Sequence, residues 1–152
     1  MRTASDILLT KPAMFNVIDP DTTIIDALQM MNSVNLSYLV VKKDNDFLGI
    51  FSERDYSRNV TLKGLQTDTA TVKEAMSTSF PSVGMTETFE SCMNLLNSHK
   101  TRYLLVFEKK QLRGVITIHD LLREVMNSRE HVFDEYITLA IKESAALKGK
   151  IF

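Results

Sequence analysis

The sequence predicts an α/β protein of the α+β kind, built from two pseudo-symmetric copies of a strand-helix-strand-strand-helix unit and a C-terminal helix. Three observations predict it: an internal repeat, apolar residues at helical and strand spacings, and a hydrophobic content of 44% over 152 residues. A chain of this size buries roughly 70% of the surface that its unfolded form exposes, enough for a core without disulfides. The expected segments are 1–66 for the first repeat, 67–128 for the second and 129–152 for a helical tail.

The internal repeat has a fixed offset of 65 residues, so that residues 15–58 align with residues 80–123 without a gap. Many further pairs preserve apolar bulk or a hydroxyl group. Because chance pairing rarely keeps such an order, we interpret the repeat as a duplication of one unit. The identical pairs are Phe15/Phe80, Thr23/Thr88, Asn32/Asn97, Ser33/Ser98, Tyr38/Tyr103, Leu39/Leu104, Val41/Val106, Gly49/Gly114, Asp55/Asp120 and Arg58/Arg123.

Each copy contains the same local signals in the same order. N-cap residue types precede a run with apolar residues on one helical face, and two β-forming runs then flank a polar turn. For the first copy these patterns predict a helix over about 22–34, strands over 38–41 and 47–52, a turn over 42–46 and a helix over 53–62. For the second copy they predict a helix near 87–98, strands over 103–107 and 112–117, a turn over 108–111 and a helix near 118–127.

The remaining segments connect or extend the two copies. Residues 61–71 are polar and contain Gly64, which is typical of a linker. A short helix leading into a strand is expected before each copy, at 5–9 and at 71–76. Residues 129–147 carry apolar side chains at helical spacing and predict a C-terminal helix that covers an apolar surface of its own module or of a second subunit.

Composition excludes several functional classes. A net charge of −1 without a basic stripe argues against a nucleic-acid partner. No apolar run approaches the ~20 residues that span a bilayer, so we expect no membrane partner either. The expected compartment is the cytoplasm. One cysteine and three histidines make an internal disulfide impossible and a zinc site poorly supplied. No catalytic motif is present, and Cys92 lies on the apolar face of a predicted helix, so we expect no enzyme.

One motif occurs in both copies: glycine, two apolar residues, a hydroxyl residue, two variable residues and aspartate. It covers residues 49–55 and residues 114–120. The hydroxyl at the end of the strand can cap the following helix, and the aspartate in the first turn suits the helix dipole. Taken alone, each motif is explained by a capping box.

The duplicated unit with this motif at the end of each copy resembles a tandem cystathionine-β-synthase (CBS) domain pair, or Bateman module. The likeness runs from about residue 5 to 127, and residues 52–60 and 72–76 are similar to small stand-alone bacterial CBS-pair proteins. The resemblance implies two repeats packed through their sheets, with clefts between them that take adenosine-containing ligands such as AMP, ADP, ATP, NAD(H) or S-adenosylmethionine. It also implies a homodimer.

Carried over residue by residue, the resemblance assigns Asp55 and Asp120 to the ribose hydroxyls, since a carboxylate can accept two hydrogen bonds from a cis-diol. It places Ser52 and Thr117 at the phosphate. The adenine would lie against strand residues of each copy, namely Val17 and Ile18 in the first and Ser82 and Val83 in the second.

The two copies differ at the position twelve residues before the motif glycine, where the family often has a basic residue against the phosphate. The second copy has Arg102 and the first has Ser37. A charge-assisted contact contributes about 1.5–3 kcal/mol, so we expect the second copy to bind phosphate better. The first copy could use Arg54 or Arg58 instead.

The expected function is therefore a non-catalytic regulatory or sensor module that binds an adenosine-containing nucleotide, AMP, ADP, ATP or NAD(H), in the cleft between the repeats. No cofactor is required, and the partners are the nucleotide, a second copy and an unidentified regulated protein. The alternative is a structural interaction or dimerisation module with vestigial clefts. Ser37 and the apolar segment 129–147 favour that alternative.

Overall fold

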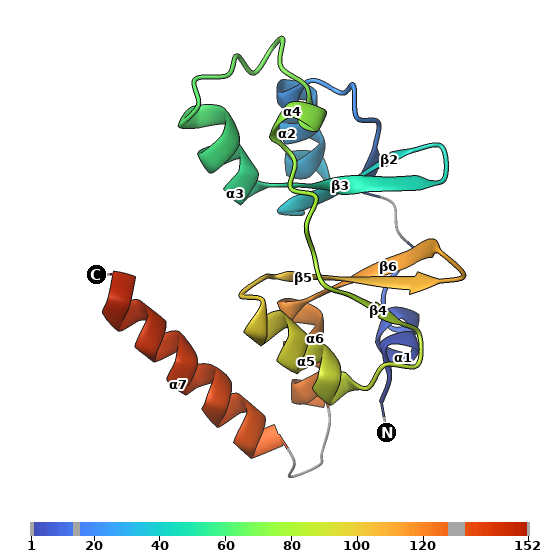
Figure 1. Ribbon diagram of the computed structural model, residues 1–152, viewed down its shortest axis with the longest axis vertical. Coiled ribbons are helices and arrows are strands. Elements are labelled where there is room, and N and C mark those ends of the chain that lie inside the picture. Colours follow the sequence, from blue (N-terminus) through green and yellow to red (C-terminus); the bar gives the residue numbers. More distant parts are fainter. Residues whose placement is uncertain (1, 14–15, 128–132, 152) are drawn as a thin grey trace. The chain divides into compact units, whose positions relative to one another are not determined.

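The computed structural model describes residues 2–13, 16–127 and 133–151. It is a mixed α/β structure with two three-stranded sheets, ordered β1-β2-β3 and β4-β5-β6, which confirms the predicted fold class (Figure 1). The elements are α1 (Ala4–Leu9), β1 (Val17–Ile18), α2 (Ile24–Val34), β2 (Tyr38–Lys43), β3 (Asp46–Ser52), α3 (Glu53–Asp55), the π-helix η1 (Tyr56–Thr61), α4 (Val72–Ala75), β4 (Ser82–Gly84), α5 (Phe89–Ser98), β5 (Tyr103–Glu108), β6 (Gln111–Thr117), α6 (Ile118–Asn127) and α7 (Phe133–Ile151).

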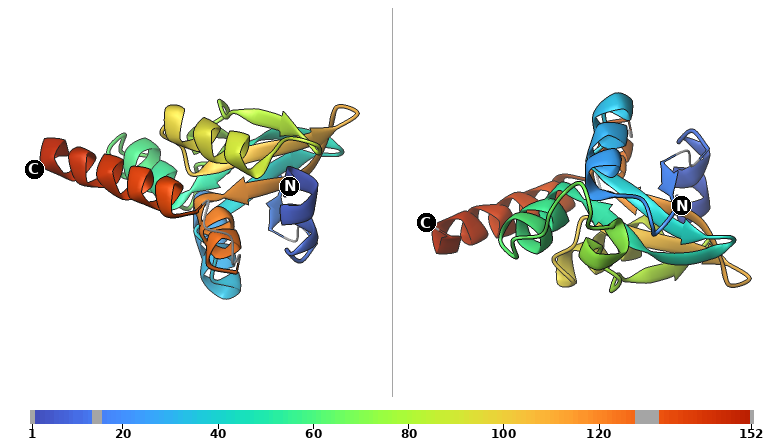
Figure 2. Two further views of the ribbon diagram at one scale, coloured as in Figure 1. Left: turned by 90° about the horizontal axis from the view of Figure 1, so that it is seen from below. Right: turned by 90° about the horizontal axis from the view of Figure 1, so that it is seen from above.

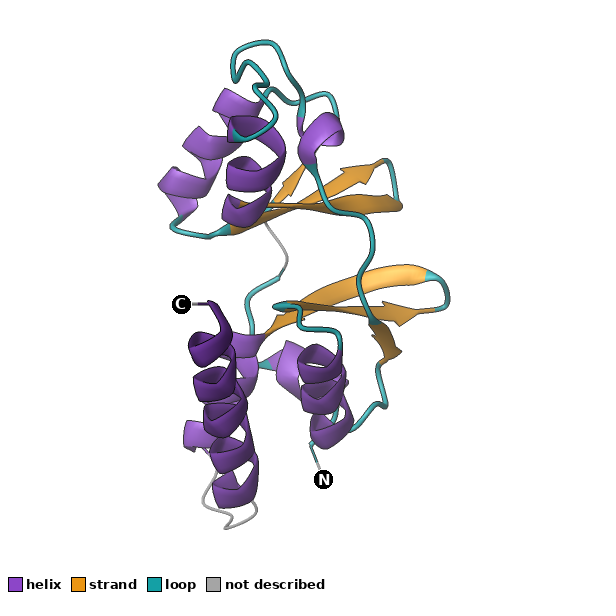
Figure 3. Ribbon diagram, turned by 60° about the vertical axis from the view of Figure 1, so that its left-hand side comes forward, coloured by secondary structure: helices purple, strands orange, loops and turns teal. Residues whose placement is uncertain are grey.

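The predicted helices and strands of both copies are present, with boundaries displaced by at most two residues. Thr23 caps α2 by accepting a hydrogen bond from the Asp26 backbone, and Thr88 caps α5 in the same way through Ser91. In the first sheet β1 runs parallel to β2, and β3 runs antiparallel to it. In each repeat the helices cover one face of the sheet (Figure 3).

The segment 53–62, predicted to be one helix, is only partly α-helical. Only α3 is an α-helix, and the chain continues as the π-helix η1, in which Leu62 donates to the Ser57 carbonyl at 3.2 Å. The matching α6 of the second repeat is α-helical throughout. The wider turns of η1 carry Asn59, whose side chain is held by the backbone of α4, so a contact distant in sequence accompanies the irregularity.

The chain divides into two compact units whose chain segments are interleaved. One unit comprises residues 1–10, 81–106 and 115–152, and the other comprises residues 11–80 and 107–114. The N-terminal helix α1 therefore belongs with the second repeat, whereas α4 belongs with the first. The boundaries between the two repeats and the tail that the sequence predicts, at 66/67 and 128/129, stay a prediction.

Each unit has its own apolar core on the helix-covered face of its sheet. The core of the first repeat consists of Ile18, Ile24, Ala27, Met31, Leu39, Val41, Phe51, Val60, Ala70, Val72 and Ala75. The core of the second repeat consists of Ala4, Ile7, Val83, Phe89, Cys92, Met93, Leu96, Leu104, Val106, Ile116, Leu121 and Val125.

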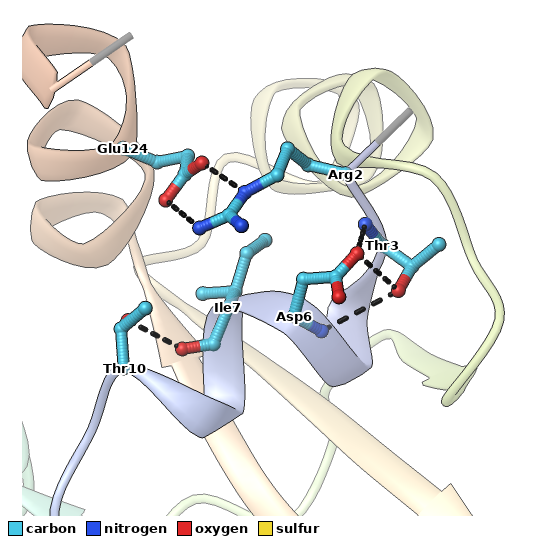
Figure 4. A network of polar contacts seen from close by, with 6 residues as sticks. All are labelled: Arg2, Thr3, Asp6, Ile7, Thr10 and Glu124. Carbon is cyan, nitrogen blue, oxygen red and sulfur yellow. Dashed lines mark hydrogen bonds and ion pairs between the residues drawn. The ribbon is translucent and has the colours of Figure 1, made fainter.

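Helix α1 is joined to the second repeat by both packing and polar contacts. It packs beside α6, its Ala4 and Ile7 side chains are buried in that core, and the Ala4 backbone donates to the Glu87 carbonyl at 2.8 Å (Figure 2). The Arg2 guanidinium forms an ion pair with Glu124 of α6, and Thr3 and Asp6 form a capping box at the start of α1 (Figure 4).

The C-terminal helix is present as α7. Its Tyr136 and Ile137 side chains pack against the core of the second repeat, while Leu139 and Ile141 are exposed. The predicted residues 129–132 lie outside the described part of the chain. Among the described residues, no helix has the length and apolar character needed to cross a membrane.

Candidate functional site

The motif of the first repeat forms a buried capping box where β3 ends. Asp55 Oδ2 accepts hydrogen bonds from the Ser52 backbone N–H and from Ser52 Oγ, both at 2.9 Å. The Asp55 backbone donates in return to Ser52 Oγ at 3.3 Å. Both side chains are buried, so the carboxylate is fixed in orientation at the junction of strand and helix.

The motif of the second repeat repeats this geometry. Asp120 Oδ2 accepts from the Thr117 backbone at 2.8 Å and from Thr117 Oγ1 at 3.0 Å, and Asp120 N donates to Thr117 Oγ1 at 3.3 Å. Asp120 is only 7% exposed. Its Oδ1 lies 3.4 Å from an Arg123 guanidinium nitrogen, whose side chain is 62% exposed.

Arg102 lies beside this second motif. Its carbonyl accepts a hydrogen bond from Ile118 N, the first residue of α6, at 3.3 Å. The corresponding bond of the first repeat joins Glu53 N to the Ser37 carbonyl at 3.0 Å. The backbone thus holds the Arg102 position next to the helix start in one repeat and a neutral serine there in the other, and the Arg102 residue is exposed.

The predicted adenine-contacting residues lie on edge strands of their sheets. Ile18 and Val83 are core residues, and Val17 and Ser82 are exposed. An edge strand presents backbone N–H and C=O groups that a neighbouring strand does not use. Those groups can read the edge of a planar base, while the buried side chains hold the strand in place.

Within each repeat, the structure brings some of the predicted site residues together. Ser52 and Asp55 meet at the end of β3, with Arg54 and Arg58 exposed on α3 and η1. Thr117 and Asp120 meet at the end of β6, beside Arg102.

The two predicted phosphate hydroxyls already donate to their own aspartates. Since a hydroxyl has one proton, Ser52 and Thr117 orient the carboxylates in this geometry and would have to rotate to donate to a phosphate.

Three polar residues of the first repeat were not singled out from the sequence. Ser77 Oγ donates to Asp55 Oδ1 at 2.5 Å, and Asn59 Nδ2 donates to the same oxygen at 3.4 Å. Asn16 is buried and donates its side-chain amide to the Tyr38 carbonyl at 3.2 Å. No motif marks these residues, because their partners lie 22, 4 and 22 positions away and depend on the fold.

The remaining reactive groups offer little for catalysis. No group of three or more histidine, cysteine or acidic side chains gathers as a metal site among the residues that the structure describes. Burial raises the pKa of the Cys92 thiol to about 11, with a smaller contribution from the charge of Glu87. A neutral buried thiol is a poor nucleophile, as expected from its place on the apolar face of α5.

Comparison with known proteins identifies the family of these repeats. The family model for the CBS domain matches residues 4–61 and 72–127. The CBS domain-containing protein CBSX3, mitochondrial, of Arabidopsis thaliana is 28% identical over 112 residues, which cover 70% of this chain and 54% of that protein. The chain thus spans about half the length of this curated relative.

Two solved structures carry the comparison further. The crystal structure of a CBS domain, NE2398, has a TM-score of 0.77 at 31% identity, covering 83% of this chain and 98% of that one. The crystal structure of CBSX2 in complex with AMP has a TM-score of 0.68 at 25% identity, covering 82% and 96%. The two segments that the CBS family model matches each contain one copy of the motif described above. The chain belongs to the CBS-domain family and has two CBS domains in tandem.

Proposed function

We propose that the protein is a non-catalytic regulatory module that binds an adenosine-containing nucleotide through the second repeat. The observation that carries the proposal is the buried carboxylate of Asp120, held by Thr117 beside Arg102. A solved relative, CBSX2, binds AMP, which supports the adenosine class of ligand. AMP, ADP, ATP and NAD(H) all carry the groups that these residues would recognise.

The chemistry of recognition divides between three parts of the repeat. The Asp120 carboxylate accepts hydrogen bonds from the ribose cis-diol, since Thr117 already fixes its orientation. The Arg102 guanidinium and the N-terminal end of α6 suit a phosphate, because both carry positive charge or partial charge. The backbone of β4 reads the adenine edge.

In this proposal the nucleotide is a signal and no cofactor is required. Regulation follows only if the nucleotide binds two arrangements of the protein with different affinity, since equal affinity shifts no population. The proposal includes a homodimer in the cytoplasm that acts on an unidentified regulated protein.

The first test compares AMP with ligands and variants that lack one contact each. Arg102→Ala should weaken AMP binding about ten- to a hundred-fold, the loss of a charge-assisted contact, and leave adenosine binding unchanged. Ser37→Ala, the same position in the first repeat, should change neither. Calorimetric titration measures both affinities.

Recognition of the ribose is tested in the same titrations. Asp120→Asn should weaken AMP binding at least ten-fold, and 2′-deoxy-AMP should bind the wild-type protein correspondingly less well. Asp6→Asn is the control, since it disturbs a capping box of the same unit that the proposal does not use. Equal affinity of wild type and Asp120→Asn for AMP would contradict the assignment of Asp120.

A structural interaction module is the second candidate, favoured by one observation. Leu139 and Ile141 are 54% and 62% exposed on α7, where a partner would cover them. Absence of binding by AMP, ADP, ATP, NADH and S-adenosylmethionine at millimolar concentration would favour this candidate over the nucleotide sensor.

A further inference from the structure

Residues 2–5 lie along the segment that leads from β4 into α5. Three backbone hydrogen bonds of 2.8 to 2.9 Å join them to residues 85–89: from Ala4 to Glu87, from Ser5 to Met85 and from Phe89 to Arg2. The start of α1 is therefore docked on the chain that leaves β4, the strand proposed to read the adenine.

A side-chain ion pair joins the same residues to α6. The Arg2 guanidinium donates two hydrogen bonds to the Glu124 carboxylate, from Nε to Oε1 and from Nη2 to Oε2, the second at 3.0 Å (Figure 4). Such a paired, planar contact fixes the direction of both side chains. The Glu124 side chain is only 11% exposed, so loss of Arg2 would leave a carboxylate that little water reaches without its partner.

Glu124 lies one helical turn after Asp120 on α6. Residues four positions apart lie on the same face of a helix, so the contact that fixes Glu124 also fixes the part of α6 that carries the Asp120 carboxylate. Residues 2–5 thus contact two elements that the proposed site uses. They reach α6 through the ion pair and the chain leaving β4 through the backbone.

The first repeat has an equivalent link at the matching position. Asn59, four residues after Asp55, donates to the Ala75 carbonyl at the end of α4 at 2.8 Å. In each repeat, the residue four positions after the motif aspartate therefore ties its segment to a short helix from which the chain leads into the other repeat. The link of the first repeat is an uncharged hydrogen bond, whereas that of the second is an ion pair.

Helix α1 depends on these contacts because it is short. It has six residues, and helices shorter than about 12–15 residues are marginal in water on their own. A capping box of Thr3 and Asp6 supports its first turn, and its buried residues are Ala4 and Ile7. Elements with few buried contacts open before the rest of a domain. We therefore expect α1 to undock before the sheet of its unit opens.

From these contacts we propose that Arg2 and Glu124 form a clasp, through which nucleotide binding at Asp120 and docking of α1 stabilise each other. The inference rests on the proposed function and names the element that the nucleotide regulates. A nucleotide held by β4 and α6 favours the arrangement in which residues 2–5 bridge both elements. By linkage, docked α1 raises the affinity for the nucleotide by the same factor. Arg2 and Glu124 are positioning residues in this proposal.

Amide hydrogen exchange of the full wild-type chain tests the clasp directly. Saturating AMP should slow exchange of the backbone amides of residues 4–10 by about five-fold or more, the lower end of a typical coupling. Helix α2 of the first repeat is the internal control and should exchange at the same rate with and without AMP. Calorimetric titration in the same buffer shows that AMP is bound.

Substitutions of the two partners distinguish the clasp from a simple effect of charge on the phosphate. Arg2→Gln and Glu124→Gln should both weaken AMP binding by about five-fold and speed exchange in residues 4–10. A charge effect alone has opposite signs, because loss of an acid favours a bound phosphate and loss of a base disfavours it. Glu143→Gln, which changes an exposed acid of α7 in the same unit, is the matched control and should change neither quantity.

The double variant of Arg2→Gln and Glu124→Gln shows whether the two residues act as one unit. It should bind AMP as weakly as either single variant, since the same clasp is lost in all three proteins. Losses that multiply would show two independent contributions and overturn the clasp. Circular dichroism checks that each variant is folded, and the exchange experiment on the wild-type protein does not depend on any variant.

The outcomes separate the clasp from the proposed function. Binding of AMP with unchanged exchange in residues 4–10 would overturn the clasp and leave nucleotide binding intact. Tighter binding of AMP by Glu124→Gln than by the wild-type protein would do the same. No binding of AMP by the wild-type protein would overturn both.

Discussion

Asp55 and Asp120 each lie in the first turn of the helix that follows a strand, and each presents a fixed carboxylate there. The local part of this role was predictable, since a hydroxyl followed three residues later by an acid is a capping signal in any sequence, and both capping boxes are present. The bond from Ser77 to Asp55 was not predictable, because 22 residues separate the partners and only the packing of α4 brings them together.

The capping role also means that stability and binding must be measured separately for these residues. Removing either aspartate leaves the hydroxyl and backbone N–H of a buried residue without their acceptor, which costs about 1–3 kcal/mol. Asparagine keeps an acceptor oxygen and the side-chain shape, and is for that reason the substitution used in the binding tests above.

At the scale of a single side chain, Cys92 should be unreactive in the folded protein. With the thiol pKa raised from 9.0 to about 11 by burial, the thiolate fraction at pH 8 falls about a hundred-fold. We expect 5,5′-dithiobis(2-nitrobenzoate) to react at least a hundred-fold more slowly with native protein than with protein in concentrated urea, measured by absorbance. Equal rates in the two conditions would contradict the burial of this thiol.

At the scale of elements, helices α2 and α5 end in the same way with different residues. Asn35 has φ 53° and Lys100 has φ 51°, both in the left-handed region. In both repeats the next backbone N–H closes the helix, from Leu36 to the Met31 carbonyl and from Thr101 to the Leu96 carbonyl, each at 3.1 Å. Asparagine tolerates this conformation better than lysine, so the second repeat carries more backbone strain at its helix end.

Replacing Lys100 by glycine should therefore stabilise the protein. Glycine relieves the left-handed strain at some cost in unfolded-state entropy, for a net gain of about 0.5–1 kcal/mol. For a chain of this size, that gain raises Tm by roughly 1–4 °C. Thermal unfolding followed by circular dichroism measures the change. Asn35→Gly is the matched control and should give a smaller increase; a Tm for Lys100→Gly below that of wild type would contradict the argument.

At the scale of the whole molecule, the duplication and most elements could be predicted, because hydrophobic spacing and turn residues are local properties of the sequence. The sequence did not indicate which helix joins which repeat. The structure assigns α1 to the unit of the second repeat, through Ala4, Ile7 and the Arg2–Glu124 pair. Such an exchange depends on contacts more than a hundred residues apart, which no periodicity encodes.

The candidate site, too, could be predicted from the sequence only in part. Arg102 against Ser37 was visible as a difference between the copies and predicted that the second repeat binds phosphate better. The contacts of Ser77 and Asn59 with Asp55 could not be predicted, since they depend on how η1 and the end of α4 pack together. Nucleotide binding by the second repeat is therefore the central claim.

Native mass spectrometry of the wild-type protein with added AMP tests that claim most directly. The account predicts a complex whose mass exceeds that of the protein by at least one AMP per chain, or a co-purified adenosine-containing nucleotide that AMP replaces. A spectrum that shows only the unliganded protein at millimolar AMP, ADP, ATP, NADH and S-adenosylmethionine would contradict it.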